Sequence, residues 1–284
     1  MRDLLFAAAL GIAAFGDQAP VRELIAGLTS GDAVVRAKAA CELKDQGDRA
    51  GDAIDSLVRL LGDATPVQQD VCRERWWQGR DDETTPGQLA AAALVGIGSR
   101  SVPALIAALQ QPQWISRKNA TWALGALDDP RGVSPVTAAL QDREAPVRQQ
   151  AAWALGAMDA SSAVQGLIGA LKDTDERVRQ QAAWALGSIG SKAAAPALTQ
   201  ALKDTDARVR HQSAWALGAI GDRSAVPGLV EALRDSDKTV RSQSAWALGS
   251  LGDSRATEGL VAALKDTDST VRRQAAWALG AIGR

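Results

Sequence analysis

The side chains that most often carry out chemistry are scarce in this sequence. It has one histidine, His211, and two cysteines, Cys41 and Cys72, so sites built from several His or Cys residues lack their ligands. It also contains no Gly-rich phosphate loop and no G-x-S-x-G, H-E-x-x-H or paired C-x-x-C motif. We therefore expect no metal, no cofactor and no catalytic residue, and we look for a binding function instead.

Tryptophan is the unusual component of the composition. The 284 residues include nine Trp, two Phe and no Tyr, and 46% of them are apolar, which is ample for a packed core. Lys and Arg number 32 against 33 Asp and Glu, for a net charge of -1. Since affinity for a phosphate backbone comes from a net basic face, this balance argues against nucleic acid as a partner.

A repeat with a fixed period organises the chain. The string W-A-L-G occurs six times, each copy 31 residues after the previous one. We call its tryptophans the Trp column: Trp122, Trp153, Trp184, Trp215, Trp246 and Trp277. Each unit holds two helical patterns, separated by turns rich in Gly and Asp. The glycines are expected at helix ends, where they permit a left-handed cap. Units that bury their apolar faces only against neighbours predict an all-α solenoid.

The consensus V-R-x-Q-(A/S)-A-W-A-L-G resembles the HEAT-like repeats of the phycobilisome-lyase type. The resemblance covers residues 17–284 and is closest from residue 115 onward. It implies antiparallel helix pairs in a right-handed superhelix, with the second helix of each pair lining the concave side. Residues 35–43 and 86–98 match the second-helix pattern more weakly. We therefore expect about eight helix pairs in a single solenoid.

The period breaks at residues 63–86, between the two helices of the second pair. We expect this insertion to project as a loop from one edge of the solenoid. Long loops are often functional, but a tolerated insertion that caps the divergent N-terminal repeats is an equally good interpretation.

Residues 1–16 have the features of a signal peptide. An apolar run from Leu4 to Phe15 is too short to span a bilayer, and Ala14 and Gly16 offer small residues for cleavage. We expect no membrane span and an exported protein, periplasmic or extracellular. Because Ala9, Leu10 and Gly11 echo A-L-G, the segment is alternatively half of a decayed repeat, which would leave the protein cytoplasmic.

The helical period predicts where the tryptophans point. At about 100° per residue, the Val, Ala and Leu positions of a second helix share one face, and each Trp falls opposite to it. One interpretation is that the indoles fold back over the adjacent helix and shield its alanines. The other is that they form a solvent-accessible stripe along the concave groove that binds a partner. We predict the second and keep the first as its alternative.

Polar residues accompany each Trp on the same face. The Gln column lies three residues before it and comprises Asn119, Gln150, Gln181, Gln212, Gln243 and Gln274. The variable column lies one residue earlier and comprises Lys118, Gln149, Gln180, His211, Ser242 and Arg273. In a binding surface this second column would set specificity, and His211 is interpreted as one of its members rather than as a catalytic group.

Charged residues form another repeating column at the edge of the packed face. The ladder arginines are Arg117, Arg148, Arg179, Arg210, Arg241 and Arg272. They lie beside loop aspartates of the D-x-D turns: Asp173, Asp175, Asp204, Asp206, Asp235, Asp237, Asp266 and Asp268. We predict bidentate guanidinium–carboxylate pairs between successive repeats. A phosphate-binding role is weaker, because these acids would already neutralise each Arg.

The two cysteines are candidates for a disulfide. Cys41 occupies the Trp position of its repeat, and Cys72 lies in the insertion, which can reach over that face. If the protein is exported, an oxidising compartment would preserve a disulfide between them. The bond would close a loop of about 30 residues and bring Trp76 and Trp77 near the start of the groove. The alternative is two unrelated free thiols.

These observations predict a non-enzymatic scaffold that binds a protein or peptide along a Trp- and Gln-lined groove. The alternative is a bilin (tetrapyrrole) lyase or chromophore-binding chaperone of the HEAT-like class. Diiron hydroxylases of this repeat class depend on His–Glu pairs that one histidine cannot supply. We also expect self-association through the last pair, whose apolar residues lack a following repeat: Leu260, Val261, Leu264, Val271 and Leu279.

Overall fold

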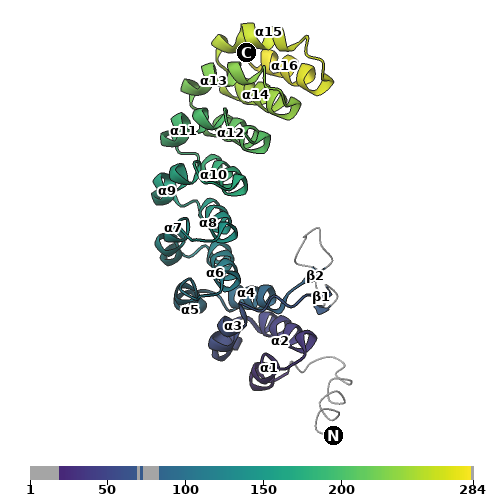
Figure 1. Ribbon diagram of the computed structural model, residues 1–284, viewed down its shortest axis with the longest axis vertical. Coiled ribbons are helices and arrows are strands. Elements are labelled where there is room, and N and C mark those ends of the chain that lie inside the picture. The colour runs from purple at the N-terminus through teal and green to yellow at the C-terminus, as the bar shows by residue number, and fades with distance from the viewer. Residues whose placement is uncertain (1–18, 69–70, 73–82, 283–284) are drawn as a thin grey trace. The chain divides into compact units, whose positions relative to one another are not determined.

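The computed structural model describes residues 19–68, 71–72 and 83–282 (Figure 1). Within this part the chain forms an all-α solenoid of sixteen helices, α1 to α16, with one short β-hairpin. The helices make eight consecutive pairs, as predicted. The chain divides into two compact units, Met1–Ala104 and Leu105–Arg284, which we describe separately. The predicted signal peptide, residues 1–16, lies outside the described residues.

The first unit contains two helix pairs and the insertion. Its elements are α1 (Val21–Gly27), α2 (Ala33–Gln46), α3 (Ile54–Leu60), β1 (Val67–Gln68), β2 (Glu83–Thr84) and α4 (Pro86–Ile97). The insertion lies between α3 and α4, the two helices of the second pair, as the break in the period predicted. Its two ends pair antiparallel, with Val67 opposite Thr84. Thr85 then begins α4 with a capping box, because its hydroxyl accepts from the Gln88 N–H while the Gln88 side chain accepts from the Thr85 N–H.

The second unit alternates short first helices with long second helices. The first helices are α5 (Val102–Ala108), which begins before the division, α7 (Val133–Ala139), α9 (Val164–Ala170), α11 (Ala195–Ala201), α13 (Val226–Ala232) and α15 (Thr257–Ala263). The second helices are α6 (Trp114–Leu127), α8 (Ala145–Ala157), α10 (Glu176–Ile189), α12 (Ala207–Ile220), α14 (Lys238–Leu251) and α16 (Ser269–Ile282). A short 3-10 turn precedes each of these first helices.

The two kinds of helix form two layers in this unit (Figure 1). Each second helix from α6 to α16 packs directly on the next one, whereas the first helices from α7 to α15 pack mainly on the second helix of their own pair. The second helices approach one another closely because the contacting residues are small: Ala182, Ala183 and Ala185 of α10 are fully buried. The second helices therefore make one continuous layer.

Local sequence sets the ends of each second helix. In α10 the side chain of Asp175 accepts from the N–H groups of Arg177 and Val178, which caps the first turn. Gly190 ends the helix in the left-handed region, with φ of 71°. Gly221 and Gly252 repeat this end with φ of 74° and 60°. The expected left-handed glycine caps are thus present at these three positions.

No single helix in the described ranges is long and apolar enough to cross a membrane. Two consecutive segments, Pro86–Ile97 and Ser99–Ala108, are together long and apolar enough for a span, but the chain bends sharply between them.

Candidate functional site

Five members of the Trp column, Trp153, Trp184, Trp215, Trp246 and Trp277, pack on glycines of the preceding helix pair. A Cβ atom at Gly187 would lie 2.6 Å from Cζ3 of Trp215, and one at Gly218 would lie 2.6 Å from Cζ3 of Trp246. The same approach recurs at Gly125, Gly156 and Gly249, where the distances are 3.1, 2.7 and 2.5 Å. Each of these residues is the glycine of W-A-L-G. They lie within the second helices and make room for the next Trp, so attributing all the glycines to helix caps was wrong for this set.

One edge of each of these five indoles therefore covers the preceding helix, as the alternative interpretation described. The other edge remains accessible, since the first five members of the Trp column are only half-buried. Trp277, the last member, is 48% exposed. The solvent-accessible stripe is accordingly made of partly covered indoles rather than of fully exposed ones.

Four of the indole N–H groups of the Trp column are accessible and unpaired. In the described part of the chain, Nε1 of Trp153, Trp184, Trp215 and Trp246 has no hydrogen-bond partner, and no buried side-chain nitrogen or oxygen is left unpaired. Since these nitrogens have no partner and no unpaired side-chain nitrogen is buried, they must be accessible to solvent. The second-helix layer thus carries a row of free donors at intervals of one helix pair.

The Gln column adds free amides beside these donors. Gln150, Gln181, Gln212, Gln243 and Gln274 are half-buried. Their side chains make no hydrogen bond to any described residue, so their donors and acceptors are also available to a ligand. Asn119, at the start of the column, differs because it is buried, with 6% exposure.

The variable column carries little charge in the middle of the unit. Gln149, Gln180, His211 and Ser242 are half-buried neighbours of the Gln column. Burial lowers the pKa of His211, and the charge of Asp237 opposes this shift only in part, so the imidazole is neutral at pH 7. Permanent charge appears only at the two ends. Lys118 is half-buried, with a pKa lowered by burial, and Arg273 is exposed.

These columns form an open surface. A small cavity of about 190 Å³ lies elsewhere, between the first helices α9 and α11, where Ile168 and Leu171 line it. Within the described ranges, no three His, Cys, Asp or Glu side chains cluster closely enough to hold a metal ion. The arrangement is therefore suited to an elongated ligand lying across several second helices.

The predicted arginine ladder is confirmed for five of its six arginines; Arg272, the sixth, donates among the described residues only to the backbone carbonyl oxygens of Asp266 and Thr267. In five successive pairs, Nε and Nη2 of a ladder arginine donate to both oxygens of an aspartate 25 residues later; in Arg179 and Asp204 the distances are 2.7 and 2.8 Å. The ladder aspartates are Asp142, Asp173, Asp204, Asp235 and Asp266. Arg36 and Asp63 make a similar pair at 2.7 Å in the first unit.

The two aspartates of each D-x-D turn have different roles. The first pairs with a ladder arginine, whereas the second caps the following helix, as Asp175 does for α10. Arg179 also donates from Nη1 to the carbonyl oxygens of Asp173 and Thr174. These arginines are committed to the scaffold, which removes the phosphate-binding alternative for the paired ones.

The ladder shifts the pKa values of its carboxyl groups. Burial would raise the pKa of Asp204, but hydrogen bonds from Arg179 and from the Asp206 N–H outweigh it, so the pKa lies below its ordinary value. Asp142, Asp173 and Asp235 are lowered for the same reasons. In Asp266 the hydrogen bond from Arg241 is the largest cause of the lowering.

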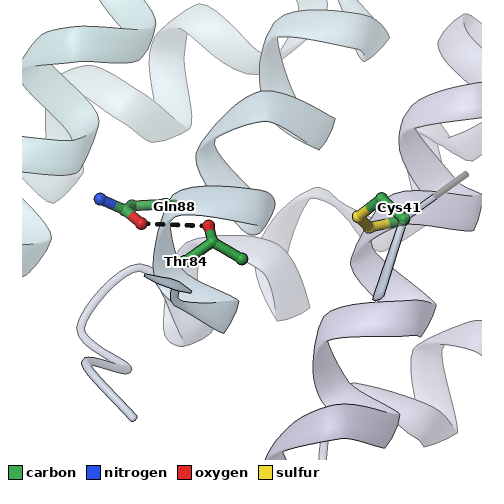
Figure 2. Close-up of a disulfide and its surroundings, with 4 residues drawn as sticks. Cys41, Thr84 and Gln88 are labelled. Atoms are coloured by element: carbon green, nitrogen blue, oxygen red, sulfur yellow. Dashed lines mark hydrogen bonds between the residues drawn. A yellow bond between two sulfur atoms is a disulfide. The ribbon is translucent and has the colours of Figure 1, made fainter. Parts of the chain in front are cut away.

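The predicted disulfide is also confirmed. Cys41 of α2 is bonded to Cys72 of the insertion, with Cα atoms 5.9 Å apart (Figure 2). Near it, the Thr84 hydroxyl donates to Oε1 of Gln88 at 3.2 Å, which ties the returning end of the insertion to α4 (Figure 2). Trp76 and Trp77, which we expected near the start of the groove, lie outside the described residues.

Comparisons with known proteins agree with this architecture. The model of the HEAT repeats matches residues 80–155, 133–210 and 195–280. Yeast importin-β (Kap95p) is 14% identical, with a TM-score of 0.65 over 94% of this chain and 42% of its own. An engineered protein is 23% identical, with a TM-score of 0.53 over 93% of this chain and 89% of its own.

A designed armadillo repeat protein in complex with the peptide (KR)4 is 19% identical, with a TM-score of 0.51 over 64% of this chain and 99% of its own. At these identities the solved structures show a shared fold and nothing more. No curated protein sequence matches the chain. Because the matched repeats together run from residue 80 to residue 280, which is more than half of the sequence, the protein belongs to the HEAT-repeat family.

Proposed function

We propose that the protein is a non-enzymatic scaffold that binds a protein or peptide segment along the Trp and Gln columns of its second unit. The observation that carries this proposal is the row of free indole N–H groups beside free Gln amides on successive second helices. A folded protein usually pairs its half-buried side-chain donors internally or leaves them to water. Here the same unpaired set recurs in four successive pairs, those of α8, α10, α12 and α14, which a ligand with regularly spaced polar groups can use.

The backbone of a polypeptide has such regularly spaced groups. Each peptide unit offers a carbonyl acceptor and, except before proline, an N–H donor. A Gln side chain can donate to one and accept from the other, while the accessible Trp edge contributes apolar area. The designed armadillo repeat protein with a similar fold is in complex with a peptide, which supports a repeat surface of this kind as a peptide-binding one.

Selection of peptides tests the proposal. A phage-displayed library of random peptides would be selected on the wild-type protein. The enriched peptides would then be measured on two triple variants: a column variant with Gln181→Ala, Gln212→Ala and Gln243→Ala, and a control with Gln141→Ala, Gln165→Ala and Gln200→Ala. The control glutamines are exposed and lie outside the second helices. None of the six side chains makes an internal hydrogen bond among the described residues, so neither variant loses one.

We expect enriched peptides to bind the wild type and the control equally and the column variant about tenfold more weakly, because several hydrogen bonds are lost. Peptides that bind all three proteins alike, or a library that yields no binder, would refute the proposal.

Two further features belong to the same proposal. We propose that the protein is exported, since disulfides such as that between Cys41 and Cys72 form and persist in oxidising compartments. Edman sequencing of the secreted protein should then begin near Asp17. The exposed side chains of Val261, Leu264 and Trp277 are the proposed surface for self-association. A strictly monomeric protein in light scattering at high concentration would count against that surface.

A further inference from the structure

The spacing, polarity and charge of the columns define a ligand more closely than a peptide in general. We propose that the Trp and Gln columns bind a proline-rich segment in the polyproline II conformation, with three ligand residues for each helix pair. This inference rests on the proposed function, because it names the class of segment that the same surface binds.

The first argument is the spacing of the rows. Successive second helices touch through Gly and Ala; a Cβ atom at Gly187 would lie only 2.8 Å from Cα of Ala216. Packed helices have axes about 8–10 Å apart. One turn of polyproline II contains three residues and advances about 9.3 Å. Each turn would therefore present the same side of the ligand to the next Trp and Gln.

An extended β-strand does not fit this spacing. Its side chains and its hydrogen-bonding groups alternate, so only an even number of residues returns the same side. Two residues advance roughly 6.6 Å and four advance roughly 13 Å, and both distances miss the interval between packed helices. The repeat therefore favours a period of three over a period of two.

The second argument is the excess of donors on the surface. Each indole N–H can only donate, and the Trp Nε1 atoms of the middle pairs are free. In polyproline II the carbonyl groups are fully solvated and have no internal partner. Proline has no N–H, so such a segment offers acceptors without donors that would need satisfying. Pyrrolidine rings would pack on the accessible indole edges, as proline-rich segments do in aromatic-lined grooves.

The third argument is the absence of permanent charge in the middle of the columns. From Gln149 to Gln243, the Gln and variable columns contain only Gln, Ser and the neutral His211. A strongly acidic or basic segment would give up hydration there without finding a counter-charge. An uncharged ligand avoids the cost of desolvating a charge, and a polyproline II segment also has little conformational entropy to lose on binding.

Synthetic peptides test the proposal on the full oxidised protein. Blocked oligoprolines of 6, 9 and 12 residues would be titrated and followed by Trp emission and calorimetry. A flexible (Gly-Ser)6 peptide would serve as the uncharged comparison and (Lys-Arg)6 as the basic one. The column variant and the control variant defined above would be measured in parallel.

We expect the 12-residue oligoproline to bind, with affinity rising at each added turn of three residues. We also expect at least a tenfold loss in the column variant and no loss in the control, which corresponds to about three hydrogen bonds. Oligoproline binding that is absent, or equal in both variants, overturns the inference. So does tighter binding of either comparison peptide.

The library experiment separates this failure from that of the proposed function. If its enriched peptides lack proline yet depend on the column glutamines, the surface binds peptides of another class, and only the inference fails. If no peptide depends on those glutamines, both fail.

Discussion

Replacing Gly187 by alanine should destabilise the protein although alanine is the better helix former. In α10 the new Cβ would lie 2.6 Å from Cζ3 of Trp215 and 2.8 Å from both Cα and Cβ of Ala216. Carbon atoms are in favourable contact only at about 3.5–4.0 Å, so α12 would have to move by roughly 1 Å. The obstructing atoms include backbone, which no rotamer change can withdraw.

The expected magnitude follows from two opposing effects. Overpacking of a well-packed interface costs about 1–3 kcal/mol, and the upper half of that range applies where backbone must shift. The higher helix propensity of alanine returns about 1 kcal/mol. We therefore expect a net loss of about 1–2 kcal/mol in the free energy of unfolding, together with a red shift of Trp emission as the indole of Trp215 loses its seat.

Gly169→Ala is the matched control. Gly169 lies in α9 and is exposed, and apart from its chain neighbours and the backbone of its own helix no described atom lies within 4 Å of the position its Cβ would take. At this position the Gly-to-Ala substitution should stabilise the protein by about 0.5–1 kcal/mol, because alanine has the higher helix propensity and lowers the conformational entropy of the unfolded chain. Urea unfolding followed by circular dichroism and by Trp fluorescence measures both variants. If Gly187→Ala is as stable as Gly169→Ala, the packing of the Trp column on the glycines is not as described.

Three other predictions concern the links between elements. Arg179→Ala should lower the free energy of unfolding, measured by thermal denaturation, by about 2–3 kcal/mol, because it leaves the 11% exposed side chain of Asp204 without its partner. Lys203→Ala is the control, since its pair with Glu231 is largely exposed, and it should change the same quantity by less than about 0.5 kcal/mol. Since folding lowers the pKa values of the ladder aspartates, their stabilisation should be complete above about pH 5 and lost as the pH falls below 4; melting temperatures that are flat down to pH 2 would contradict this. Cys41→Ser should lower the stability of the first unit by roughly 3–4 kcal/mol in non-reducing calorimetry, and no effect would mean that the bond does not form.

The helix pairs, the ladder and the disulfide were all predictable from the sequence, for the same physical reason. Each depends on the helix face to which a side chain points and on the number of residues between the positions involved. Both can be read from a strict repeat. Arg179 and Asp204 recur as a set in successive units, so their pairing needs no knowledge of side-chain rotamers. Cys41 occupies a Trp position, which fixed its facing.

Features that depend on side-chain torsions or on very short segments could not be predicted in this way. The helical wheel places the Cβ of Trp215 opposite the packed face, but a torsion turns the ring back onto Gly187. The role of the W-A-L-G glycine follows from that torsion and was missed with it. The two-residue strand around Val67 has no period to detect.

Each helix pair from α7/α8 to α13/α14 has two features that face the following pair and two that face the preceding one. The W-A-L-G glycine and the ladder arginine face forward, while the Trp and the ladder aspartate face backward. A tandem duplicate of a whole unit therefore contains the residues that contact both neighbours, and it can pack between any two other units. Gain or loss of one residue in a second helix would instead turn its Trp by about 100° away from the waiting glycine. Duplication of entire units should therefore preserve the packing and smaller changes of length should disrupt it, which is sufficient to explain the unvarying 31-residue period of this chain without a ligand.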